Sequence, residues 1–171
     1  MRPLFLQRVD AGARAAAPLV LTLMIVIINV VPLRLPSYSV IAPDLVLMAV
    51  FYWIVHRPDL LRPWGAFMVG ILDDILVGTP LGVNAFVLLL VHWMIISQHK
   101  TLRTLSFGLL WFAFAVIALG AKLILVGLAL AINRGLIDPM VLLAQFSFTV
   151  AVYPLVAMLM GRAQRAFLPA T

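Results

Sequence analysis

The sequence predicts an all-α integral membrane protein, and its composition and its apolar segments carry that prediction. Of the 171 residues, 65% are hydrophobic and 11% are charged, whereas a soluble domain is about 45–50% apolar and about 25% charged. A globule of this size could not cover so much apolar side chain. Disorder is excluded because it requires low hydrophobicity and high net charge. Alternating single-face apolar strands are absent from the sequence, so we expect a helical bundle rather than an outer-membrane barrel.

Six apolar segments are predicted to cross the membrane. A spanning helix needs about 20 apolar residues, with a range of about 17–25. Proline and glycine mark the joints: the stretch Pro32–Pro36 precedes the second segment, and His56–Pro63 precedes the third. No linker is long enough to separate two domains, so residues 1–171 are expected to form one transmembrane domain. The predicted spans are Ala15–Val31, Tyr38–Val55, Gly65–Val77, Leu81–Ser97, Leu105–Ile132 and Met140–Met160.

Three of these segments differ from an ordinary membrane span. The first follows several arginines, as a signal peptide would, but no small-residue cleavage pattern follows it directly, so we expect it to be retained. The third is short and contains two acidic residues. The fifth would measure about 42 Å as a helix, against a hydrocarbon core of about 30 Å. We therefore expect it to tilt, to bend near Gly120 or Gly127, or to project beyond the membrane.

Lysine and arginine alone set the orientation of a membrane protein. The chain has 12 of these cations and 6 acidic residues. If both termini are cytoplasmic, the outer segments hold only Arg34 and Arg134, and Lys122 lies inside a span. Adding or removing one span destroys this asymmetry, so we predict six spans with both termini inside. The inner cations are then Arg2, Arg8, Arg14, Arg57, Arg62, Lys100, Arg103, Arg162 and Arg165.

Four ionisable residues are predicted to form a buried charge cluster: Asp44, Asp73, Asp74 and Lys122. An ionisable group in hydrocarbon costs about 2.5–3.5 kcal/mol or more, so each needs a partner or a wet cavity. A rise of about 1.5 Å per residue places Asp44, Asp74 and Lys122 in the outer half of the bilayer. We expect Lys122 to pair with Asp74 or Asp44. The alternative, in which its four-carbon stem carries the ammonium outward to water, stays open.

A row of small residues follows one face of the third segment. Ala66, Gly70, Asp74 and Gly78 recur every four residues and therefore share a helix face. Small residues at this spacing allow another helix backbone to approach closely. Pro80, with Gly78 and Gly82 on either side, predicts the end of the helix and a tight turn. We expect Ala66, Gly70, Asp74, Gly78 and Gly82 to form a helix-packing face for a neighbouring helix or a partner.

This stretch resembles the MreD family, the integral membrane rod shape-determining proteins of bacteria. The family pattern of Gly, Asp and Gly at spacing four, followed by a Leu-Gly turn, matches Gly70, Asp74, Gly78, Leu81 and Gly82. A second match is the segment Pro43–Trp53, with a proline followed by an apolar run and Tyr-Trp. Asp73 is an extra acid beside the family aspartate. The polar residue of the fifth span varies in the family, so the resemblance implies no role for Lys122.

The resemblance implies a multi-pass protein of the bacterial cytoplasmic membrane. MreD-like proteins lie beside MreC, a single-span protein with a large external domain. They work with the actin-like MreB, the polymerase RodA and a class B penicillin-binding protein in lateral peptidoglycan synthesis and rod-shape maintenance. The family also looks like the substrate-binding subunits of energy-coupling-factor transporters, which makes a related fold an expectation without implying transport. We therefore expect a non-enzymatic scaffold that contacts lipid and not nucleic acid; self-association stays open.

Two other functions are alternatives to the scaffold. A small-molecule-binding or transport subunit would need a wet polar pocket between the second, third and fifth spans, and a solidly packed interior would remove it. An intramembrane enzyme would need catalytic parts that the sequence lacks. Asp73 and Asp74 diverge on a helix, no second acidic pair exists, and His56, His92 and His99 have no metal-ligand spacing. With no cysteine in the chain either, we expect no catalytic residue, cofactor or metal.

Overall fold

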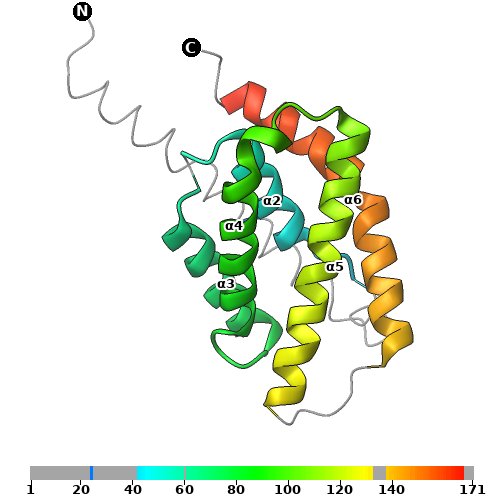
Figure 1. The fold of residues 1–171 in the computed structure, drawn as a ribbon. Coiled ribbons are helices and arrows are strands. Elements are labelled where there is room, and N and C mark those ends of the chain that lie inside the picture. The colour runs from blue at the N-terminus through cyan, green and yellow to red at the C-terminus, as the bar shows by residue number, and fades with distance from the viewer. Residues whose placement is uncertain (1–23, 25–41, 60, 133–137, 168–171) are drawn as a thin grey trace, which may run out of the picture.

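The computed structural model describes residues 24, 42–59, 61–132 and 138–167, and the regular elements of these residues are all helices (Figure 1). The all-α prediction is therefore confirmed for the part of the chain that is described. Apart from Met24, which is helical, the first predicted span, 15–31, lies outside these residues. The labelled helices are α2 (Leu45–His56), α3 (Pro63–Val77), α4 (Val83–Leu102), α5 (Phe107–Ala131) and α6 (Pro139–Phe167).

Three helices, α4, α5 and α6, are long and apolar enough to cross a membrane. By contrast α2 has 12 residues and α3 has 15, so each is shorter than the usual span of about 20. The described residues therefore do not confirm the expected count of six spans. The last helix also runs beyond the predicted end at Met160, as far as Phe167.

The second segment starts later than predicted. Residues 42–44 are not helical, and the helix begins at Leu45 rather than at Tyr38, although residues 38–41 lie outside the described part. The reason is local: the side chain of Asp44 accepts a hydrogen bond from the backbone N–H of Leu47, as an N-cap does. Proline at position 43 supports the same boundary, because it has no N–H to donate.

Helix α2 forms the centre of the bundle. All residues from Val46 to Val55 are buried, and α2 packs chiefly against α4 and α6. Helices α3 and α4 lie on one side of it and α5 and α6 on the other (Figure 1). Three rings join the second group: Phe51 of α2 meets Phe114 of α5 edge-on at 5.1 Å, and Phe114 stacks on Tyr153 of α6 at 4.1 Å. Such pairs stabilise packing beyond the area they bury.

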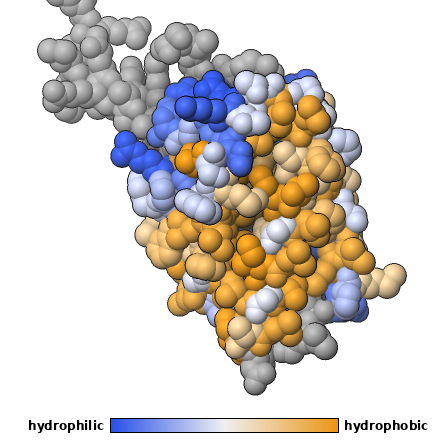
Figure 2. All heavy atoms as spheres, in the orientation of Figure 1, coloured by the Kyte–Doolittle hydropathy of each residue, from blue (hydrophilic) through white to orange (hydrophobic). Residues whose placement is uncertain are grey.

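The surface has a polar end and apolar flanks (Figure 2). At the polar end α4 passes into α5 and α6 finishes. Below it, large apolar side chains such as Trp93, Leu123 and Met140 are 65–79% exposed, far more than a soluble domain tolerates in one contiguous surface. Cations gather at or beside the C-terminal ends of α2, α4 and α6, which lie at the polar end: Arg57, Lys100, Arg103 and Arg162. This is the end that the charge pattern predicts to be cytoplasmic.

Candidate functional site

Asp74 joins the end of α3 to the beginning of α4. Its side chain is fully buried, and its carboxylate accepts hydrogen bonds from the Thr79 hydroxyl at 2.6 Å and from the backbone N–H groups of Gly82 at 2.8 Å and Asn84 at 3.0 Å. The N–H of Ala85 lies at 3.5 Å. The first N–H groups of a helix have no partner inside the helix. Asp74 therefore caps α4 from the neighbouring helix, where its charge also complements the helix dipole.

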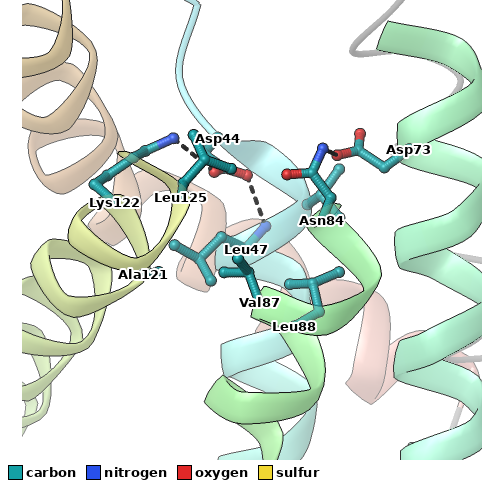
Figure 3. A pocket seen from close by; sticks show the side chains of 10 residues that line it. Asp44, Leu47, Asp73, Asn84, Val87, Leu88, Ala121, Lys122 and Leu125 are labelled. Atoms are coloured by element: carbon teal, nitrogen blue, oxygen red, sulfur yellow. Dashed lines mark hydrogen bonds and ion pairs between the residues drawn. The ribbon is translucent and has the colours of Figure 1, made fainter. Parts of the chain in front are cut away.

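Asp73 faces a different group from its neighbour. It is 9% exposed and accepts a hydrogen bond from the side-chain amide of Asn84 at 3.0 Å. Figure 3 shows the two side chains meeting across the gap between α3 and α4. Consecutive residues on a helix are rotated by about 100°, and this rotation separates the two carboxylates into distinct roles.

Lys122 forms an ion pair with Asp44. The ammonium of Lys122, on α5, lies 3.0 Å from Oδ2 of Asp44, at the start of α2 (Figure 3). The side chain of Lys122 is 11% exposed and that of Asp44 is 27% exposed. Of the two partners that the depth estimate allowed, Asp44 is the one observed, because Asp74 is engaged in the turn before α4. The alternative in which Lys122 reaches outward to water is wrong.

The start of α2 is also tied to α6. The backbone N–H of Asp44 donates to the hydroxyl of Thr149 at 3.0 Å, and the side-chain amide of Gln145 donates to the carbonyl of Ala42 at 3.1 Å. Thr149 and Gln145 were absent from the predicted site. The sequence could have indicated them, however, since they are two hydrogen-bonding side chains at spacing four and therefore share one face of a mostly apolar helix.

The predicted charge cluster is thus divided. Asp44, Asp73 and Lys122 line one small pocket, together with Asn84 and apolar side chains of α2, α4 and α5 (Figure 3), whereas Asp74 lies outside it. The volume of this pocket is about 20 Å³, which is room for about one water molecule. Three charged groups around a space of this size can hold helices together, but they cannot surround a substrate.

The predicted small-residue face is occupied by α4. A Cβ added to Gly70 would lie 2.3 Å from the Cα of Ala85, so the two backbones touch as the small residues predicted. Ala66 is fully buried on the same side. This part of the face packs against the chain's own hairpin partner. It leaves no space there for the helix of another protein.

Gly78 and Gly82 have a different role from the one predicted. An added Cβ would have no neighbour within 4 Å at either position, so neither glycine is needed for close helix packing. Their φ angles are +78° and +98°, a left-handed backbone that favours glycine. Gly78 ends α3 and Gly82 precedes α4. They belong to the turn that brings Asp74 to the N-terminus of α4.

The three histidines are engaged with backbone carbonyl groups. His56, His92 and His99 lie 2.9–3.2 Å from the carbonyls of Tyr52, Leu61 and Val55, respectively. Within the described residues, no three His, Cys, Asp or Glu side chains are placed to hold a metal ion. The site therefore consists of hydrogen bonds and one ion pair that position helices.

Comparisons with known proteins point to one family. A protein-family model, described as rod shape-determining protein MreD, matches residues 13–163. A relative named Rod shape-determining protein MreD, from Haemophilus influenzae, is 28% identical over 83 residues, which cover 48% of this chain and 49% of the relative. The match thus spans about half the length of that relative. No solved structure matches the chain. Because the family model covers most of the sequence, including the Asp74 turn and the Asp44–Lys122 pair, this chain belongs to the MreD family of rod shape-determining proteins.

Proposed function

We propose that this protein is a non-enzymatic scaffold of the cell-elongation complex, a multi-pass protein of the bacterial cytoplasmic membrane that supports lateral peptidoglycan synthesis. The observation that carries the proposal is the use of the buried carboxylates. Asp44 and Asp74 bind an ammonium and helix N–H groups of their own chain, and Asp73 binds Asn84. Charged groups that are paired within their own chain in this way fix the relative positions of helices. A rigid bundle with an apolar exterior suits a protein that holds others in place.

The proposed direct partner is MreC, and through it the chain would be linked to MreB, RodA and a class B penicillin-binding protein. Close fit and interhelical hydrogen bonds drive helix association in lipid. The outer face of α5 is suited to such a contact, since Phe112 and Leu123 are 68% and 65% exposed. Gly120 and Gly127 on the same helix have open space around them. We place the contact with the single MreC span on this face, because α4 already covers the Gly70 face.

The proposed orientation places both termini in the cytoplasm. Arg57, Lys100, Arg103 and Arg162 lie at or beside the C-terminal ends of α2, α4 and α6, and this gathering of cations supports the orientation. The alternative function, a small-molecule-binding or transport subunit, gains no support from the pocket beside Lys122, whose volume is about 20 Å³. That volume is smaller than any ligand pocket of ordinary size, which measures about 300–1,000 Å³.

Cysteine cross-linking in native membranes tests the partner face. The chain has no cysteine of its own, so single cysteines can be introduced without removing others. We expect Leu123→Cys to cross-link to a cysteine scanned through the MreC span. The matched control is Leu155→Cys on α6, which is 60% exposed and should not react. The assignment is refuted if Leu123→Cys and Leu155→Cys cross-link to the same extent. It is also refuted if neither Leu123→Cys nor Phe112→Cys cross-links.

Cell shape tests the function itself. Depletion of the protein in its own bacterium should convert rods into spheres, and re-expression of the unaltered chain should restore rods. If depleted cells keep their rod shape and their lateral incorporation of peptidoglycan precursors, the scaffold function is wrong for this chain. This readout is independent of where on the surface the partner binds.

A further inference from the structure

A second pocket lies at the polar end of the bundle, between α2, α5 and α6. Its volume is about 380 Å³, so it is far larger than the space beside Lys122. Its walls include Phe107, Leu110 and Met158, and its polar groups include His56 and Gln164. The side-chain carbonyl of Gln164 accepts a hydrogen bond from the Tyr52 hydroxyl at 2.9 Å. The pocket thus combines an apolar wall with a polar rim.

One buried donor in this pocket has no protein partner. Tyr153 lines the pocket and is 1% exposed, yet its hydroxyl makes no hydrogen bond to any described residue. Buried polar groups in folded proteins nearly always have a partner. Because the hydroxyl oxygen is itself inaccessible, Tyr153 contributes its ring to the pocket wall and gives a ligand no polar contact.

Two cations lie close to residues of the pocket wall. Arg103, in the joint between α4 and α5, lies near enough to His56 to act on it electrostatically, and Arg162 is exposed beside Gly161 of the pocket wall. Helix α5 begins at the same place, and its N-cap Ser106 makes no side-chain capping bond. The first N–H groups of α5 are therefore available to an anion, and the helix dipole favours one there. Nearby Asp59 is engaged by Arg57 at 3.2 Å.

We propose that this pocket binds an anionic phospholipid from the leaflet on the polar side. An acyl chain lies along Phe107, Leu110 and Met158, and the phosphate lies at the rim near Arg103 and the start of α5. A phospholipid matches both halves of the pocket, since it joins an apolar chain to an anionic group at the depth where the helices leave the hydrocarbon. A basic residue near an anionic membrane surface contributes measurable attraction of its own.

Two substitutions test the two halves. Gly161→Leu fills the pocket: its Cβ would be 3.5 Å from the Tyr52 hydroxyl, an ordinary contact, and the rest of the side chain occupies lipid space. The matched control is Gly127→Leu, on the open surface of α5. Arg103→Gln removes a rim charge, with Arg62→Gln, exposed at the start of α3, as its control.

The full-length protein in detergent is titrated with phosphatidylglycerol or with phosphatidylcholine, and bound lipid is counted by native mass spectrometry alongside the thermal midpoint. We expect phosphatidylglycerol to bind preferentially and to raise the midpoint. Gly161→Leu should abolish the preference, and Arg103→Gln should weaken phosphatidylglycerol binding about fivefold. In both controls the lipid preference and the lipid-induced rise in the midpoint should match those of the unaltered protein.

Equal binding of the two lipids would overturn the proposal, and so would an unchanged preference in either Gly161→Leu or Arg103→Gln. Stabilisation by inorganic phosphate alone to the same extent would also overturn it, because the acyl chain would then contribute nothing. If Gly161→Leu fails to fold, the exposed Arg103→Gln variant decides the outcome by itself.

Discussion

The ammonium of Lys122 lies 3.0 Å from the carboxylate of Asp44, although the two residues are 78 positions apart in the chain. This pair connects the middle of α5 to the cap of α2, and α2 is the buried centre of the bundle. The same carboxylate accepts a hydrogen bond from the backbone N–H of Leu47. The Asp44 side chain therefore both caps α2 and holds it against α5.

Removal of one member of this pair should destabilise the protein. Lys122→Met leaves an uncompensated carboxylate, and we expect a loss of about 3 kcal/mol in the free energy of unfolding, the lower end for a buried pair because Asp44 keeps some exposure. The double variant Asp44→Asn with Lys122→Met should recover much of that loss, since neither charge is then left alone. Thermal unfolding in detergent measures both, with Lys100→Met on the exposed polar end as control. No recovery in the double variant would contradict the pairing.

Gly70 should not tolerate even alanine. A Cβ there would meet the backbone of Ala85 at 2.3 Å, so α3 and α4 must move apart, at a cost of about 1–3 kcal/mol. Gly127→Ala is the matched control, because nothing lies within 4 Å of its added Cβ and alanine favours a helix by up to about 1 kcal/mol. The thermal midpoints of the two variants should move in opposite directions. Equal midpoints would mean that the hairpin is not closely packed at Gly70.

Gly78 distinguishes a turn from a partner face. If its left-handed φ is the whole reason for glycine, then Gly78→Ala and Gly78→Leu should cost the same, about 1–2 kcal/mol. Gly78→Asn should cost less, since asparagine adopts this conformation more readily. Thermal unfolding measures the cost, and co-purification with MreC should be the same for the alanine and leucine variants. A selective loss of MreC with leucine would restore Gly78 to a partner interface.

Asp74 and Asp73 should respond differently to the same change. Asp74→Asn replaces one acceptor oxygen with a donor that faces other donors, and it also removes the charge from the start of α4. We expect a loss of about 2 kcal/mol, in the range for hydrogen bonds to charged groups. Asp73→Asn, with one hydrogen bond to a side chain, should lose less than half as much. Hydrogen exchange at the N–H groups of Gly82 and Asn84 reports the cap directly: it should accelerate in Asp74→Asn alone, and equal acceleration in both variants would argue against the cap.

Much of the fold could be predicted because apolar segments and breakers are local properties. The C-terminal end of the third segment, and the presence of the fourth, fifth and sixth, follow from runs of apolar residues between Pro, Gly and charged residues. The start of α2 was misplaced because a continuous apolar run looks helical until a proline and a capping aspartate interrupt it. The length of α6 was underestimated because a helix can continue past the apolar segment with polar residues such as Gln164.

The candidate site was only half predictable, for a different reason. Depth along a helix follows from counting residues, so Asp44, Asp74 and Lys122 could be placed at similar heights. Direction around the bundle does not follow from counting, so the choice between two carboxylates for Lys122 could not be made. The lysine pairs with Asp44 because Asp74 is enclosed by the turn it caps.

The sequence by itself determined that this chain is helical and membrane-bound. It also indicated that Gly70, Asp74, Gly78 and Gly82 act together in the packing of the third segment. Only the tertiary structure decided what that group does: Gly70 admits the backbone of α4, Asp74 binds its first N–H groups, and the last two glycines shape the turn. The physical reason is that spacing determines which residues share a helix face, whereas the element that covers that face depends on long-range packing.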